Sequence, residues 1–156
     1  MRAGRLTVVL ALCASFVAAA GAARAGEPRA WDGPRVTALA KKLDEGTRAL
    51  YDAIYKQPPP IATMRKDYYR LKREVRHLKH EAHDFAGDLE RGAGMEETQP
   101  GYEALASSAR WARDAARSVF TAKDVNDRAA EVRELLNEIA PYYDPDAPDL
   151  EKLPGR

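Results

Sequence analysis

The feature that most constrains this chain is a heptad pattern of apolar side chains over residues 61–89. Spacings of three and four residues alternate without a break through Ile61, Met64, Tyr68, Leu71, Val75, Leu78, Ala82, Phe85 and Leu89. Side chains at these spacings share one face of a helix with 3.6 residues per turn. The pattern therefore predicts one long helix, from about residue 60 to 91, that buries this face against other helices.

Three further segments carry the same period. Their apolar positions are Val36, Ala40, Leu43, Thr47, Leu50 and Ile54 in the first segment, Tyr102, Leu105, Ala109, Ala112, Ala116 and Val119 in the second, and Val125, Ala129, Val132, Leu136 and Ile139 in the third. The consecutive alanines of the second segment predict a helix that approaches its neighbours closely. No segment has the alternation of a β-strand.

Proline, glycine and capping residues predict where these helices begin and end. We expect a first helix capped by Asp32 or Gly33 and ending near Lys56, and a second helix that ends at the glycines of residues 92–94. The third helix should open at Pro100, with Thr98 or Gln99 as its cap. The fourth should be capped by Thr121 or Asp124 and end before Pro141. A polar loop is expected over residues 95–99.

Four helices with short connections favour an all-α, up-down-up-down four-helix bundle with left-handed heptad packing over residues 34–141. We expect a lead-in at 26–33 and an extended, proline-rich acidic tail at 142–156, with Tyr142 and Tyr143 packed on the bundle. The alternative is a long two-helix hairpin that completes its core by dimerising. Both a monomer and a homodimer are compatible with the pattern.

Residues 1–25 have the pattern of a cleaved signal peptide. Arg2 and Arg5 precede an uncharged apolar stretch at 6–20, and Ala23-Arg24-Ala25 provides a small-x-small cleavage site. The alternative is an uncleaved membrane anchor. Leu12 before Cys13, the only cysteine, argues against lipidation. We therefore expect a periplasmic or secreted protein with no transmembrane segment after cleavage.

Composition and motifs exclude several classes of function. A formal net charge of +1 gives no case for nucleic acid as a partner. The chain has no glycine-rich phosphate loop, no nucleophile motif and no Cys-x-x-Cys-His haem attachment. These absences favour a non-enzymatic protein that binds no haem or other organic cofactor.

The histidines of the chain, His77, His80 and His83, lie at i,i+3 spacings opposite the apolar stripe of residues 61–89. Glu81 follows His77 by four residues, and Asp84 follows His80 by four. Imidazole and carboxylate groups are ligands suited to zinc or copper. One hypothesis is a weak surface metal site at these five residues, and the alternative is a solvated polar face.

The same helix carries a basic run that could dock an anionic surface or an envelope protein. The candidate docking residues are Arg65, Lys66, Arg70, Arg73 and Arg76. The alternative is that these side chains pair with acids of the fourth segment, which are Asp124, Asp127, Glu131, Glu134 and Glu138.

Residues 78–91 (LKHEAHDFAGDLER) and 132–143 (VRELLNEIAPYY) resemble uncharacterised secreted bacterial four-helix-bundle proteins. In those proteins a helix with an Ala-His-x-Phe element pairs with a final helix ending in tyrosines. The resemblance implies a bundle fold and export, and carries no known activity. The Leu-Thr-x-x-Gln element of Spy-type periplasmic chaperones is absent. We expect an exported non-enzymatic bundle with a binding or structural role in the cell envelope.

Overall fold

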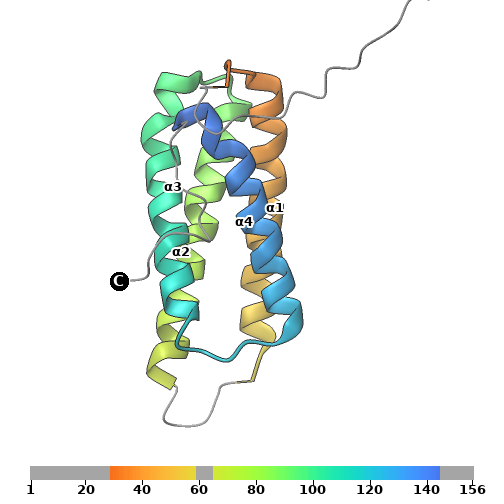
Figure 1. Ribbon diagram of the computed structural model, residues 1–156, viewed down its shortest axis with the longest axis vertical. Coiled ribbons are helices and arrows are strands. Elements are labelled where there is room, and N and C mark those ends of the chain that lie inside the picture. The colour runs from red at the N-terminus through yellow and green to blue at the C-terminus, as the bar shows by residue number, and fades with distance from the viewer. Residues whose placement is uncertain (1–28, 59–64, 145–156) are drawn as a thin grey trace, which may run out of the picture.

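A computed structural model describes residues 29–58 and 65–144, which form four helices. They are α1 (Gly33–Lys56), α2 (Arg65–Glu90), α3 (Met95–Ala116) and α4 (Lys123–Tyr143). Each helix runs antiparallel to the one before it (Figure 1). Helix α1 packs between α2 and α4, and α2 packs between α1 and α3, whereas α3 and α4 touch at few points. The chain is thus all-α with an up-down arrangement, and the two-helix hairpin is wrong because four helices pack within one chain.

The predicted apolar faces of α1 and α2 are confirmed. Every predicted position from Tyr68 to Leu89 is buried, and Ala86 joins them. Every predicted position of α1 is buried as well, including the hydroxyl-bearing Thr47. Ile61 and Met64 lie outside the described residues. The heptad pattern therefore locates the core side of both helices.

The start of α1 and the end of α2 also agree with the sequence. Asp32 caps α1, its side-chain oxygen accepting a hydrogen bond from the Arg35 N–H at 3.1 Å. Gly92 follows α2 with φ = +89°, a conformation that favours glycine. Both ends form because a residue suited to the required backbone geometry lies at the boundary.

The predicted start of α3 is wrong by one turn and a half. The helix begins at Met95, so Pro100 lies inside it. The Gly94 N–H donates to the Glu97 carboxylate at 2.8 Å, and the Thr98 hydroxyl donates to the Gly94 carbonyl at 2.8 Å. Acidic side chains in a first turn are stabilised by the positive end of the helix dipole. The predicted polar loop at 95–99 is therefore helical.

The predicted ends of α4 are wrong too. Its N-cap position is Ala122, and the helix continues past Pro141 to Tyr143. Burial of Tyr142 and Tyr143 compensates for the hydrogen bond that the proline nitrogen cannot donate. Both tyrosines pack on the bundle as expected, but as the last turn of α4 and not as part of a tail. The remaining tail, 145–156, lies outside the described residues, as do 1–28.

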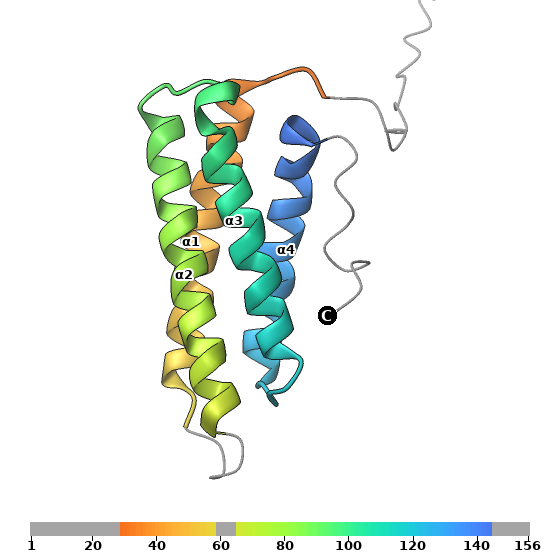
Figure 2. The same cartoon turned by 90° about the vertical axis from the view of Figure 1, so that its left-hand side faces the viewer.

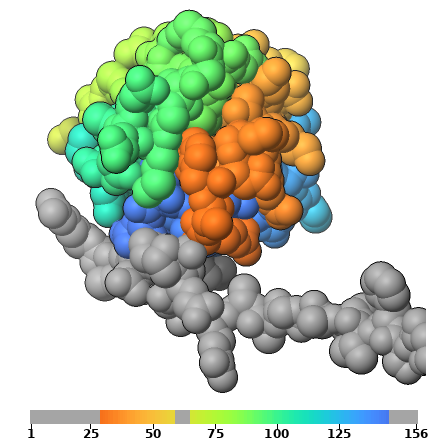
Figure 3. All heavy atoms as spheres, turned by 90° about the horizontal axis from the view of Figure 1, so that it is seen from above, coloured from red at the N-terminus to blue at the C-terminus, as the bar shows by residue number. Residues whose placement is uncertain are grey.

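Aromatic side chains close one end of the bundle, which we call the aromatic end. It consists of Trp31, Phe85, Tyr102, Tyr142 and Tyr143. The rings of Tyr102 and Tyr143 stack at 4.5 Å with an angle of 9°, and the Tyr143 hydroxyl lies 2.7 Å from that of Thr98. These contacts join α3 to α4 at this end. Figure 3 looks down on it and shows the described atoms packed closely together.

Candidate functional site: a cleft between α3 and α4

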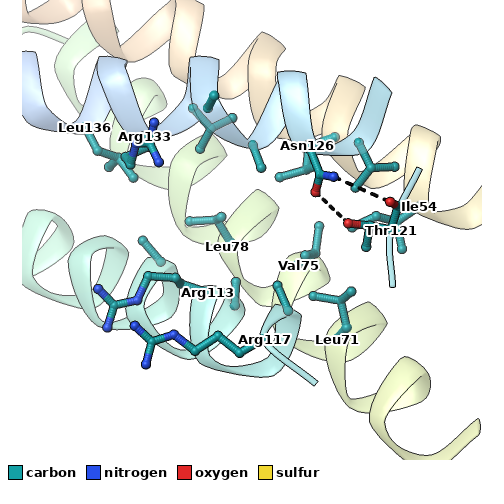
Figure 4. A pocket seen from close by; sticks show the side chains of 18 residues that line it. Ile54, Leu71, Val75, Leu78, Arg113, Arg117, Thr121, Asn126, Arg133 and Leu136 are labelled. Atoms are coloured by element: carbon teal, nitrogen blue, oxygen red, sulfur yellow. Dashed lines mark hydrogen bonds between the residues drawn. The ribbon is translucent and has the colours of Figure 1, made fainter. Parts of the chain in front are cut away.

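An apolar cleft of about 440 Å³ lies between helices α3 and α4. Figure 2 shows the same two helices from the side. In Figure 4, Leu71, Val75 and Leu78 of α2 lie at the back of the cleft. The lining comes from all four helices: Leu50, Ile54, Leu71, Val75, Leu78, Ala109, Ala112, Arg113, Ala116, Arg117, Thr121, Val125, Asn126, Ala129, Ala130, Val132, Arg133 and Leu136.

The cleft exists because the facing positions of α3 and α4 carry small side chains. Ala109, Ala112 and Ala116 line it from α3, and Ala129 and Ala130 line it from α4. The sequence predicts a buried position for Ala129, and this is wrong, since Ala129 is exposed. Alanine lets α3 pack closely on α2, as expected, but it does not reach across to α4. The cleft between α3 and α4 therefore lies over buried core residues and is flanked by partly accessible alanines.

Polar groups in the lining are few and lie at its edges. Arg113 and Arg117 extend from α3, and Arg133 projects from α4 (Figure 4). Thr121 and Asn126 lie at the lower end of the bundle, where the Thr121 hydroxyl donates to the Asn126 side-chain oxygen at 2.5 Å. Among the residues described as lining the cleft, none is acidic. The cleft is thus an apolar surface bordered by positive charge.

The predicted histidine face is exposed, as the heptad pattern indicates. His77, His80 and His83 point away from the core, Asp84 is also exposed, and Glu81 is half-buried. His83 Nδ1 lies 3.0 Å from Arg48 Nη2 and 3.4 Å from Asp44 Oδ2, so its nearest polar partners belong to α1.

Within residues 29–58 and 65–144, no three His, Cys, Asp or Glu side chains lie close enough together to hold a metal ion. The zinc or copper site at these five positions stays a prediction from the sequence. Zinc titration of the wild type against the His80→Ala/His83→Ala double variant tests it.

The predicted basic face is exposed along α2 at Arg65, Lys66, Arg70, Arg73 and Arg76. Pairing with the acids of α4 is wrong, because α4 packs on α1 and lies diagonally across the bundle from α2. Arg73 pairs with its neighbour Glu74 at 2.7 Å. Anion docking by this face stays a prediction.

Two lysines near the basic face pack on tyrosine rings of α1. The ammonium of Lys72 lies 4.4 Å from the centre of the Tyr55 ring, and that of Lys79 lies 4.4 Å from the Tyr51 ring. Cation–π contacts of this kind stabilise the packing of neighbouring helices by about 0.5–1 kcal/mol at exposed sites. These two lysines therefore have a structural role in the α1–α2 contact.

Comparison with profiles of protein families, with curated proteins and with solved structures finds no match. Within the described residues, no helix is both long and apolar enough to cross a membrane. The site must therefore be interpreted from its own geometry. The sequence analysis did not predict the cleft. The pattern that could have indicated it is the pair of arginines at 113 and 117, which are one helical turn apart and follow the alanines at 109, 112 and 116.

Proposed function

We propose that this protein is an exported, non-enzymatic helical bundle of the cell envelope that binds a small apolar molecule in the α3–α4 cleft. The observation that carries the proposal is the cleft itself. Its volume of about 440 Å³ lies in the range of small-molecule sites, and it reaches core residues of α1 and α2. Export is supported by the signal-peptide pattern of residues 1–25.

Burial of apolar surface supplies the driving force for such binding. Leu71, Val75 and Leu78 are core residues that also line the cleft. A ligand that covers apolar surface here gains about 25 cal/mol for each Å² removed from water. The accessible apolar surface of the cleft includes Ala116, Ala129 and Ala130, whereas the α2 side chains behind them are buried.

The chemistry of the lining supports binding in preference to catalysis. Its polar groups are three guanidiniums, the Thr121 hydroxyl and the Asn126 amide. A guanidinium stays protonated at neutral pH and does not serve as a general base. The Thr121 hydroxyl donates to an amide oxygen and not to a base. This set suits recognition of a ligand more than proton transfer to or from it.

A neutral fluorescent probe tests the cleft. We expect N-phenyl-1-naphthylamine to gain fluorescence with the mature protein and to lose that gain with the Ala116→Leu/Ala129→Leu variant, which adds bulk on both sides of the cleft. The matched control is Ala38→Leu, an exposed position of α1 outside the lining. Equal fluorescence with all three proteins would contradict the proposal.

Export is tested separately. We expect the full chain expressed in a Gram-negative host to accumulate outside the cytoplasm, with an intact mass that shows loss of residues 1–25. A variant that lacks this segment should remain in the cytoplasm. A full-length protein retained in the cytoplasmic or inner-membrane fraction would overturn the export part of the proposal.

A further inference from the structure

The ligand class of the cleft is indicated by the distribution of charge around it. Arg113 lies in the last turn of α3, and Arg117, four residues on, is its C-cap residue in helical conformation, so the two side chains leave the same side of this helix end. Figure 4 shows them extending side by side, at the same end of the cleft as Arg133 of α4. The lining residues thus bring three guanidinium groups and, among those described, no carboxylate, although Asp114 just outside the lining pairs with Arg113 at 3.2 Å. A positive border on one side of an apolar surface matches a ligand with an anionic head and an apolar tail.

Arginine is well suited to an anionic head group. Its planar guanidinium donates two parallel hydrogen bonds to a carboxylate, and it loses less hydration than an ammonium group does. Arg113 lies 3.2 Å from the carboxylate of Asp114, so a guanidinium of this border already pairs with a carboxylate. Asp114 itself is outside the lining. The pair shows the contact that a ligand carboxylate would make with a guanidinium of this border, and it already balances the charge of Arg113.

The polarity along the cleft fits a single chain. Charge is gathered at one end, whereas the other end carries the neutral Thr121–Asn126 pair, with Leu71 and Val75 nearby (Figure 4). A volume of about 440 Å³ is near the lower limit for small-molecule sites. A ligand with one alkyl chain fits this size and polarity better than a lipid with two chains.

We infer that the cleft binds a long-chain carboxylate, with its head group at the border formed by Arg113, Arg117 and Arg133 and its chain between the facing alanines of α3 and α4. This inference rests on the proposed function, because it names the ligand class of the same cleft. It adds two requirements. The ligand must carry a negative charge, and that charge must be joined to an apolar chain.

The test compares ligands that differ in one property at a time. Dodecanoate, 1-dodecanol and dodecylamine share a chain and differ in head-group charge, whereas butanoate keeps the head and loses most of the chain. Each is titrated below its micelle concentration, by displacement of N-phenyl-1-naphthylamine and by calorimetry. We expect dodecanoate to bind at least tenfold more tightly than either of the other long-chain ligands, and butanoate not to bind.

A matched set of arginine variants locates the head group. Arg117→Gln/Arg133→Gln should weaken dodecanoate binding about tenfold or more and leave dodecanol binding unchanged, since the chain contacts are kept. The control is Arg110→Gln, an exposed arginine of α3 outside the lining, which should change neither. Retained dodecanol binding and an unchanged helical circular dichroism spectrum show that the double variant is folded.

Each other outcome contradicts a defined part of the argument. Equal affinity for the three long-chain ligands overturns the inference and leaves the proposed function standing. Binding of butanoate as tight as that of dodecanoate also overturns it, because the site then recognises an anion alone. No binding of the probe or of any ligand overturns the proposed function too. A dimer that Ala116→Leu/Ala129→Leu dissociates would assign the cleft to a second copy of the chain.

Discussion

The two ends of the bundle are built on the same heptad period and pack differently. At the aromatic end, Tyr102 of α3 stacks on Tyr143 of α4 at 4.5 Å, and Phe85 of α2 packs against both. At the other end, facing positions of α3 and α4 carry alanines, and a cleft of about 440 Å³ separates them. The period decides which side of a helix faces its neighbours. The volume of the side chains decides whether two neighbouring helices close.

The largest expected effect is at the aromatic end. Phe85→Ala should lower the free energy of unfolding by about 3–5 kcal/mol, because Phe85 is 1% exposed and its ring contacts two other aromatic rings. Chemical denaturation of the mature protein measures the change. Phe120→Ala is the control, since Phe120 is 89% exposed and should change stability by less than about 0.5 kcal/mol. If both variants lowered the free energy of unfolding by a similar amount, the packing of Phe85 would not account for its contribution to stability.

Added volume should have opposite effects at a packed position and in the cleft. Ala82→Leu, at a fully buried position of α2, should destabilise the protein by about 1–3 kcal/mol through overpacking. Ala129→Leu should instead stabilise it by about 1 kcal/mol, because the new side chain covers apolar surface that is now accessible. Denaturant titrations of both variants give the comparison. A loss with Ala129→Leu as large as that with Ala82→Leu would mean that the cleft is closed in solution.

High pH should weaken the aromatic end selectively. Burial raises the pKa of Tyr102 and of Tyr143 to about 12, from an ordinary value of 10.0. The folded state therefore holds these protons more tightly than the unfolded state does. Their contribution to stability is present below about pH 10 and is lost as the pH rises towards about 12.

Unfolding free energies measured across that interval, with tyrosinate absorbance as the second signal, check this prediction. The Tyr102→Phe/Tyr143→Phe variant should show a smaller decrease over the same interval, because neither ring can ionise. A decrease of the same size in the variant would assign the alkaline instability to other groups.

The smallest expected effect lies outside both ends, where the exposed His83 and Arg48 lie beside the half-buried Asp44. His83→Ala should change the free energy of unfolding by less than about 0.5 kcal/mol, because exposed ion pairs of this kind contribute little. Thermal and denaturant unfolding near pH 6 and near pH 8 measure it. If His83→Ala lowered the free energy of unfolding by more than about 1 kcal/mol at either pH, the histidine face would contribute to stability as much as a contact in the core.

Much of the fold could be predicted from the sequence, because burial in α1 and α2 follows directly from the period. Each predicted position from Val36 to Ile54 and from Tyr68 to Leu89 is buried. Helix ends were predicted less well, since they depend on contacts between distant residues. Tyr143 lies in helix beyond Pro141 because its ring packs against Phe85 and Tyr102, which are far away in the sequence.

The candidate sites divide in the same way. The exposure of His80 and of the basic face on α2 follows from their heptad positions, and the structure agrees. The cleft could not be predicted, because an alanine stripe is compatible both with close packing and with a gap. The outcome depends on the distance between α3 and α4.

The sequence by itself therefore determined four helices, the buried faces of α1 and α2, and the side of α2 that carries histidine and arginine. The tertiary structure alone decided that α3 packs on α2 while α4 packs on α1. Tyr102 and Tyr143 join α3 to α4 at the aromatic end, whereas towards the other end a cleft lies between their facing alanines. That separation, which no local pattern encodes, brings Arg113, Arg117 and Arg133 to the border of one apolar cleft.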